Sequence, residues 1–249
     1  KSDSTSNNPF VELSVPEFTD WQNQSQLVEH IAAMPTTAYG YGYVLTGQGD
    51  PVQLESARVS GDFFTTLGAR PLLGRVFTAE DDYPGAALVV VLSHYLWQER
   101  FSADPDIVGR VITLGQVGYT VVGVMPARFE FPKGVSVWTP LKAAIQKRTV
   151  ENRGAVFLQA IGRLKHGVTL DQVEAELNTI VGQLAAEHPD TESLGHRVVI
   201  TPLAEYVFGN ARPALWLLLS ATGLLLLIAC VNIANLLLAR ALSRRRELA

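Results

Sequence analysis

The chain has 249 residues, of which 47% are hydrophobic and 18% charged, and its formal net charge is −4. Four arginines lie within residues 240–249, so the rest of the chain carries 16 basic and 23 acidic residues. This balance argues against a nucleic-acid partner, because phosphate contacts need clustered lysine and arginine. Cys230 is the only cysteine, so no internal disulfide can form and stability must come from a hydrophobic core.

The first predicted helix follows a polar segment, residues 1–13, which is expected to be a linker. Ser14, Pro16 and Glu17 give a capping box with an early proline, a strong start signal. Apolar residues then follow at helical spacing as far as Pro35, where the helix is expected to end: Phe18, Trp21, Val28 and Ile31.

The middle of the chain, about residues 50–140, is expected to form an inserted β-rich subdomain. Ser60 and Ser93 are each expected to cap a short helix. Strands are expected over residues 39–45, 53–59 and 88–92, and a hairpin over residues 111–114 and 119–125.

Residues 155–203 give a clear strand–helix–strand pattern. A second capping box at Thr169 and Gln172 precedes an amphipathic helix that ends at His188. Residues 197–203 again have the pattern of a strand. Because the apolar stripe of this helix must cover a sheet, the unit is expected to pack on the Ser14 helix and the strand after it. The predicted fold class is therefore α+β, with ferredoxin-like layers.

Residues 213–239 are apolar and uncharged over a length that exceeds what a bilayer core requires. Arg212 precedes this run, and a basic segment follows it within residues 240–249. The positive-inside rule therefore places the C-terminal end in the cytoplasm and the residues before Arg212 outside. Residues 1–13 lack a signal-peptide pattern, so an upstream membrane helix is expected, and further chain is expected after Ala249.

Polar and small side chains within the apolar run have two interpretations. Asn232 and Asn235 lie on one helix face, where hydrogen bonds to a neighbouring helix are favoured over contact with a substrate or ion. Gly223 would allow close helix approach. The arginines after the run have two interpretations that can both hold, because they set the topology and could also contact an ATPase subunit. They are Arg240, Arg244, Arg245 and Arg246.

No motif in the sequence indicates a catalytic site. The phosphate-binding Gly-x-x-x-x-Gly-Lys-Ser/Thr pattern is absent, the histidines lack metal-ligand spacing, and no nucleophile–base set stands out. No cofactor or metal is therefore expected. The acidic cluster of Glu80, Asp81 and Asp82 is interpreted as a solvated turn. Core packing is favoured over a docking patch for the aromatic residues near the end of the insert, Phe129, Phe131 and Trp138.

Several sequence blocks occur together in order. They are SARVSGDFFTTLGARPLLGRVFTAEDD, VVVLSHYLWQERF, DPDIVGRVITL, YTVVGVMP and FEFP…VWTPL, and the chain ends LLLLIACVNIANLLLARALSRRRELA. Together they resemble the periplasmic core domain and second transmembrane helix of MacB/FtsX-type ABC transporter permeases, including the duplicated orphan permeases. The resemblance implies a core domain over residues 14–212, a porter subdomain from the strand–helix–strand unit and a sabre subdomain from the insert.

The resemblance also implies a function and partners. The chain would be a non-catalytic permease fragment in a bacterial inner membrane, transmitting movement driven by a separate ATPase for efflux or for lipid and lipoprotein handling. Its partners would be the lipid bilayer, the ATPase, a second permease unit (a homodimer or a duplicated half) and an extracytoplasmic protein. Two alternatives stay open: a sensor with a cytoplasmic signalling module, and an ectoenzyme.

Overall fold

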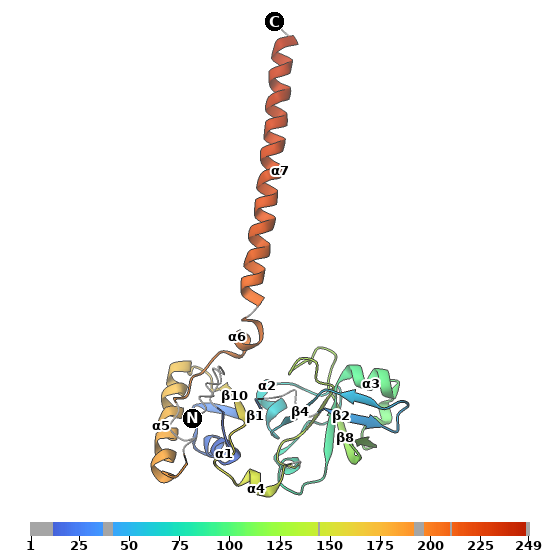
Figure 1. Ribbon diagram of the computed structural model, residues 1–249, viewed down its shortest axis with the longest axis vertical. Coiled ribbons are helices and arrows are strands. Elements are labelled where there is room, and N and C mark those ends of the chain that lie inside the picture. The colour runs from blue at the N-terminus through green and yellow to red at the C-terminus, as the bar shows by residue number, and fades with distance from the viewer. Residues whose placement is uncertain (1–11, 37–41, 144, 192–196, 210, 248–249) are drawn as a thin grey trace, which may run out of the picture. The chain divides into compact units, whose positions relative to one another are not determined.

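The computed structural model describes residues 12–36, 42–143, 145–191, 197–209 and 211–247. The chain divides into two compact units, residues 1–200 and residues 201–249. The first unit mixes helices and strands, and the second consists of the helices α6 (Leu203–Phe208) and α7 (Ala211–Glu247) (Figure 1). The α+β class expected from the sequence is confirmed.

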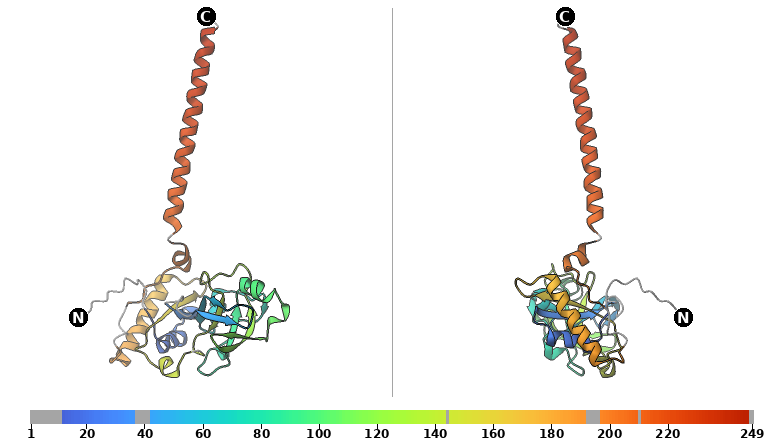
Figure 2. Two further views of the ribbon diagram at one scale, coloured as in Figure 1. Left: turned by 45° about the vertical axis from the view of Figure 1, so that its right-hand side comes forward. Right: turned by 90° about the vertical axis from the view of Figure 1, so that its left-hand side faces the viewer.

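A small antiparallel sheet of β1 (Val28–Pro35) and β10 (Leu158–Leu164) organises one part of the first unit. The helices α1 (Val15–Gln24) and α5 (Leu170–Glu187) contribute to one apolar cluster with these strands. In the right-hand view of Figure 2, α5 lies in front of the strands. The amphipathic helix therefore packs on α1 and its following strand, as its apolar stripe predicted.

The larger sheet has the order β3-β2-β7-β8-β6-β9-β4, with β5 beside β8. The pairs β6–β8 and β4–β9 are parallel, and the other neighbours are antiparallel. Its strands are β2 (Tyr43–Thr46), β3 (Val52–Leu54), β4 (Ser56–Val59), β5 (Leu73–Gly74), β6 (Val89–Leu92), β7 (Val111–Leu114), β8 (Val117–Val124) and β9 (Val137–Pro140).

Apolar clusters cover both faces of the larger sheet. One cluster includes Leu96 and Phe101 of α3, and the other is rich in aromatic rings around the fully buried Trp138. Phe129 and Phe131 pack into the aromatic cluster, which confirms core packing for them. The remaining helices are α2 (Phe63–Leu67), α3 (His94–Phe101), α4 (Lys147–Val150) and the 3-10 turns η1 (Ala79–Asp81) and η2 (Pro105–Ile107).

The predicted helix from Ser14 to Pro35 is wrong in its second half. The helix ends at Gln24, and Val28–Pro35 is strand β1. The Glu176 carboxylate of α5 accepts hydrogen bonds from the Ser25 hydroxyl and the backbone N–H groups of residues 26 and 27. These long-range contacts, together with pairing to β10, override the helical spacing of the four apolar positions named above, of which Val28 and Ile31 lie in the strand.

Two further local predictions are wrong. Ser60 does not cap α2; its hydroxyl instead accepts from the backbone N–H of Ala33, 2.9 Å away on β1. The strand expected over residues 53–59 is broken at Glu55 into β3 and β4, which pair with β2 and β9 respectively. Residues 39–41 of the strand expected over residues 39–45 lie outside the described residues, and its remainder is strand β2 from Tyr43 onwards.

Candidate functional site

The candidate functional features are the membrane-length helix α7 and, within the folded unit, the contacts that hold the segment before residue 201. Among the described residues, no group of three or more histidine, cysteine or carboxylate side chains could hold a metal ion. A depression on α5 is open to solvent, and Asp171, Asn178 and Arg197 are among its lining residues.

Helix α7 contains the one stretch among the described residues that is long and apolar enough to cross a membrane, Trp216–Asn235. Its 20 residues would extend roughly 30 Å at 1.5 Å per residue, which matches a bilayer core. The side chains of this stretch are exposed, so no protein contact in the described structure covers them.

The polar side chains of this stretch differ in how their hydrogen bonds are satisfied. Ser220 donates to the Leu217 carbonyl and Thr222 to the Leu218 carbonyl, so both hydroxyls bond to their own helix. Within the described residues, Asn232 and Asn235 have no such partner. In lipid, an amide without a partner is costly, so these two side chains are the ones that need a neighbouring helix.

Gly223 lies on a different face from the asparagine pair. At 100° per residue, Asn232 and Asn235 are about 60° apart around the helix axis, whereas Gly223 and Asn232 are about 180° apart. One neighbouring helix therefore cannot contact both faces in the same way. The basic residues Arg240, Arg244, Arg245 and Arg246 lie in the last turns of α7, and their side chains are outside the described part of the structure.

The segment that leads to α6 is held by a side-chain amide of α5. Asn178 accepts from the Val198 N–H at 3.0 Å through Oδ1 and donates to the Val198 carbonyl at 3.2 Å through Nδ2. The Val198 side chain is buried in the α1–β1–β10–α5 cluster. The strand predicted over residues 197–203 is therefore wrong: an amide side chain satisfies the backbone groups that a neighbouring strand would have paired, and Leu203 already begins α6.

Strand β1 contributes to two of the three apolar clusters of the folded unit. Ile31 and Ala33 belong to the cluster under α1 and α5, whereas Ala32 and Met34 belong to the aromatic cluster of the larger sheet. This alternation follows from the strand geometry, which sends successive side chains to opposite faces. Movement between the two cores would have to pull buried side chains of one strand out of a packed interior.

Polar contacts cross the same boundary and add to its rigidity. Arg163 of β10 donates through Nε to the Thr66 carbonyl at 2.8 Å, and Gln22 of α1 donates to the Asp62 carboxylate at 3.2 Å. The Ser60 hydroxyl on Ala33 is a third such link. These three hydrogen bonds join the part of the folded unit around β1 and β10 to the part around α2.

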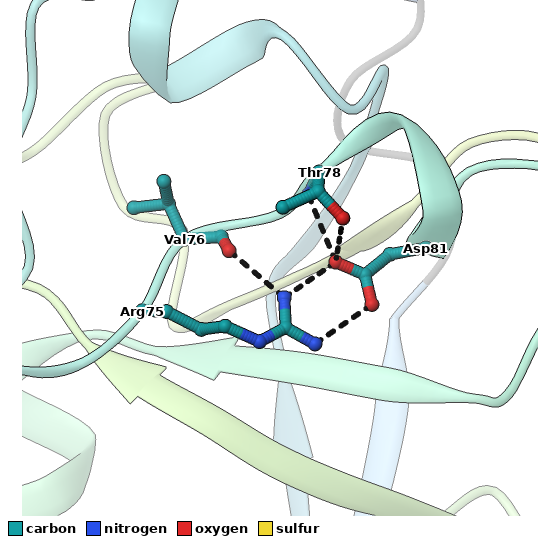
Figure 3. A network of polar contacts seen from close by, with 4 residues as sticks. All are labelled: Arg75, Val76, Thr78 and Asp81. Atoms are coloured by element: carbon teal, nitrogen blue, oxygen red, sulfur yellow. Dashed lines mark hydrogen bonds and ion pairs between the residues drawn. The ribbon is translucent and has the colours of Figure 1, made fainter.

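The prediction of a solvated turn holds for Glu80, which is exposed, but is wrong for Asp81 and Asp82, which are buried. Figure 3 shows Arg75 and Thr78 converging on the Asp81 carboxylate, with Arg75 Nη2 2.9 Å from Oδ1. Burial alone would raise the pKa of Asp81, but these hydrogen bonds and the guanidinium charge hold it below its usual value. Asp82 accepts from the backbone N–H groups of Gly61 and Lys142, and its burial raises its pKa. Both carboxylates thus have a structural role, because each accepts hydrogen bonds from other segments of the folded unit.

Glu17 is a buried carboxyl at the start of α1. Its residue is 2% exposed, and Oε2 has no hydrogen-bond partner among the described residues. Burial raises the pKa of Glu17 to about 7, against the lowering effects of the Ser14 backbone hydrogen bond and the Arg153 charge. The Ser14 cap itself is confirmed, because the Ser14 hydroxyl accepts from the Glu17 N–H at 3.3 Å.

Asn178, Glu176 and Glu17 were missed as important residues by reasoning from the sequence. Asn178 and Glu176 lie on an amphipathic helix, where a polar side chain ordinarily faces water. Their partners are about 20 and 150 residues away along the chain, so no local pattern signals the contact. Glu17 was assigned a capping role, and only the folded chain shows that the same carboxyl is buried.

Comparison with known proteins agrees with this arrangement. A model of the MacB-like periplasmic core domain matches residues 2–180. The probable export ATP-binding/permease protein MacB of Pseudomonas entomophila is 26% identical over 218 residues, covering 86% of this chain and 31% of that protein. The macrolide export ATP-binding/permease protein MacB 2 of Aeromonas hydrophila is 25% identical, covering 76% of this chain and 28% of its own length. The chain thus spans about a third of the length of these relatives.

Solved structures share the fold. The periplasmic region of MacB from Actinobacillus actinomycetemcomitans gives a TM-score of 0.54 at 14% identity, covering 74% of this chain and 78% of that one. The extracellular domain of the ABC-type transporter YknZ from Gram-positive bacteria gives 0.52 at 14% identity, covering 75% and 89%. The class defined by fold and membrane-length helix is that of ABC transporter permease ectodomains. Within it, the chain belongs to the MacB-like periplasmic core domain family.

Proposed function

We propose that this chain is the force-transmitting part of an ABC transporter permease in a bacterial inner membrane. Residues 14–212 would form the extracytoplasmic domain, residues 213–239 would cross the bilayer, and residues 240–249 would begin a cytoplasmic stalk. The small and large sheets would correspond to a porter and a sabre subdomain. The observation that carries the proposal is a folded unit of the MacB-like family whose last segment is held by Asn178 and is followed in the chain by a membrane-length helix.

The proposed mechanism contains no bond chemistry in this chain. ATP binding elsewhere would shift the membrane helices, and the Asn178–Val198 clamp would pass the shift to the folded unit. Because strand β1 contributes side chains to two apolar clusters of that unit, the unit would move as a rigid body, without a change in its internal packing. Related proteins are named as ATP-binding/permease proteins, so the ATPase belongs either to a longer version of the same polypeptide or to a separate subunit.

The relatives' names also favour one outcome of this cycle. They are export proteins, which favours efflux over lipid and lipoprotein handling and over a sensor with a signalling module. A second permease unit would supply the helix that contacts Asn232 and Asn235. An extracytoplasmic protein would receive the exported substrate.

Site-directed photocrosslinking in the full-length protein in its native membrane tests the proposal. A photoreactive amino acid would replace Arg245 in one variant and the exposed Glu99 of α3 in a matched control. We expect an ATP-binding domain to be crosslinked at position 245 and not at position 99, because the two positions would lie on opposite sides of the membrane. Crosslinking of a nucleotide-binding domain at position 99, or of a signalling enzyme alone at position 245, would contradict the permease function.

A further inference from the structure

We propose that α6 is a second membrane contact, whose apolar face lies in the headgroup layer on the outer side of the bilayer. The inference rests on the proposed function in one respect, namely that α7 crosses the bilayer with its N-terminal end outside.

Helix α6 has an apolar side that is partly exposed to solvent. Leu203, Tyr206 and Val207 are 36%, 43% and 45% exposed, and their spacing of three and four residues places them on one side of the helix. Glu205 lies on the other side, about 150° from the centre of that face at 100° per residue. A short helix with one apolar side and one carboxylate is suited to a boundary between water and hydrocarbon.

The position of α6 in the chain commits this face to lipid. Only residues 209 and 210 separate α6 from α7, and the apolar span begins five residues after Ala211, at Trp216. Five helical residues rise roughly 7 to 8 Å, which is about the thickness of one headgroup layer. α6 is therefore tethered at the outer edge of that layer, where tyrosine and tryptophan side chains are favoured.

The charge of the segment indicates which lipid interaction operates. Residues 201–209 contain no lysine or arginine and one acidic residue, Glu205. Contact must then come from burial of apolar surface rather than from attraction to anionic lipid. A helix of six residues would bind a bilayer weakly as a free peptide, but attachment to the span keeps it at high local concentration.

Depth-dependent fluorescence on the chain reconstituted in phosphatidylcholine vesicles tests the inference. Cys230 is exposed on α7 and is the only cysteine, so Cys230→Ser gives a background for single labels. An NBD fluorophore would be attached in turn to Val207→Cys, to the matched control Glu205→Cys, and to Ile228→Cys in the span. Quenching is then measured with aqueous iodide and with lipids that carry a nitroxide at the headgroup or deep in the acyl chain.

We expect the label at position 228 to be quenched by the deep nitroxide and protected from iodide. The label at position 207 should be quenched by the headgroup nitroxide and protected from iodide several-fold better than the label at 205. Replacing a third of the lipid by anionic phosphatidylglycerol, or raising the salt concentration, should leave this difference unchanged.

Three results would overturn the inference. Equal iodide access at positions 207 and 205, with position 228 still protected, would leave the span intact and remove α6 from the membrane. Loss of the 207 protection in pure phosphatidylcholine, with recovery on anionic lipid, would show that charge and not apolar burial makes the contact. Iodide access at position 228 would refute the span itself and with it the proposed function.

Discussion

At the residue scale, Asn178 connects the folded unit to the segment that continues towards the membrane. Its amide satisfies both backbone groups of a buried residue, Val198, that has no strand partner. Buried backbone groups left without a partner cost roughly 1–3 kcal/mol each. Asn178 should therefore be one of the few polar side chains of α5 whose removal lowers the free energy of unfolding.

Replacement of Asn178 by alanine should therefore loosen this connection. We expect Asn178→Ala to lower the free energy of unfolding by roughly 1–3 kcal/mol and to speed amide hydrogen exchange in peptides covering residues 197–202. Thr179→Ala is the matched control, because that exposed hydroxyl bonds only to the Ala175 carbonyl of its own helix. Unchanged exchange in the Asn178 variant would mean that burial of Val198 alone holds the segment.

Glu17 should make stability depend on pH. Burial raises its pKa from 4.5 to about 7, so between these values the folded state binds a proton that the unfolded state has released. Stability contributed by the neutral carboxyl is thus present below about pH 4.5 and is lost as the pH rises towards 7. At 1.4 kcal/mol per pH unit, the loss is on the order of 3 kcal/mol.

The variant Glu17→Gln should remove this dependence. We expect it to be more stable than the parent above pH 7 and to show a flatter curve between pH 4.5 and 7 in denaturant titrations. Asp20→Asn is a suitable comparison, since that carboxylate forms an ion pair with Arg153 and is a quarter exposed. Parallel pH curves for the parent and the Glu17 variant would rule out a buried, neutral carboxyl.

At the element scale, glycines test whether a strand or helix is held by close backbone contact. A Cβ at Gly182 in α5 would meet no atom within 4 Å, so Gly182→Ala should stabilise the chain by up to about 1 kcal/mol through helix propensity. A Cβ at Gly123 in β8 would clash with the Arg75 carbonyl, so Gly123→Ala should destabilise the chain by displacing β5. Denaturation midpoints of the two variants should move in opposite directions; a shift of the same sign would contradict the packing at one of them.

Local sequence signals predicted the helices well where the capping side chain binds within its own turn. Ser93 accepts from the Leu96 N–H, and Thr169 and Gln172 form the reciprocal box at the start of α5. The signals failed where a distant element took the same group, as Ala33 does with the Ser60 hydroxyl. The sequence does not show whether a serine hydroxyl will cap its own helix or bond to a distant strand. Both arrangements give the hydroxyl a hydrogen-bond partner, and only the fold decides which partner lies near.

At the scale of the whole molecule, the asparagine pair of α7 should govern contact with a second permease unit. In vesicles, energy transfer between donor- and acceptor-labelled chains would report association. We expect Asn232→Leu and Asn235→Leu each to weaken it by about 0.6–2 kcal/mol, because each removes a hydrogen bond that lipid cannot replace. Thr222→Val is the control, since its hydroxyl bonds to carbonyls of its own helix. Undiminished transfer in the double variant would show that another surface, such as the Gly223 face, makes the contact.

The sequence alone determined the α+β class, the family resemblance and the membrane-length helix. These depend on composition, on ordered motifs and on an uncharged run over residues 213–239, all of which are properties of neighbouring positions. The tertiary structure decided that residues 28–35 form a strand, that Asp81 and Asp82 are buried ties, and that Asn178 holds Val198. Each of these depends on a contact between positions about 6 to 150 residues apart, and the free energy of such a contact exists only once the chain has brought the two groups together.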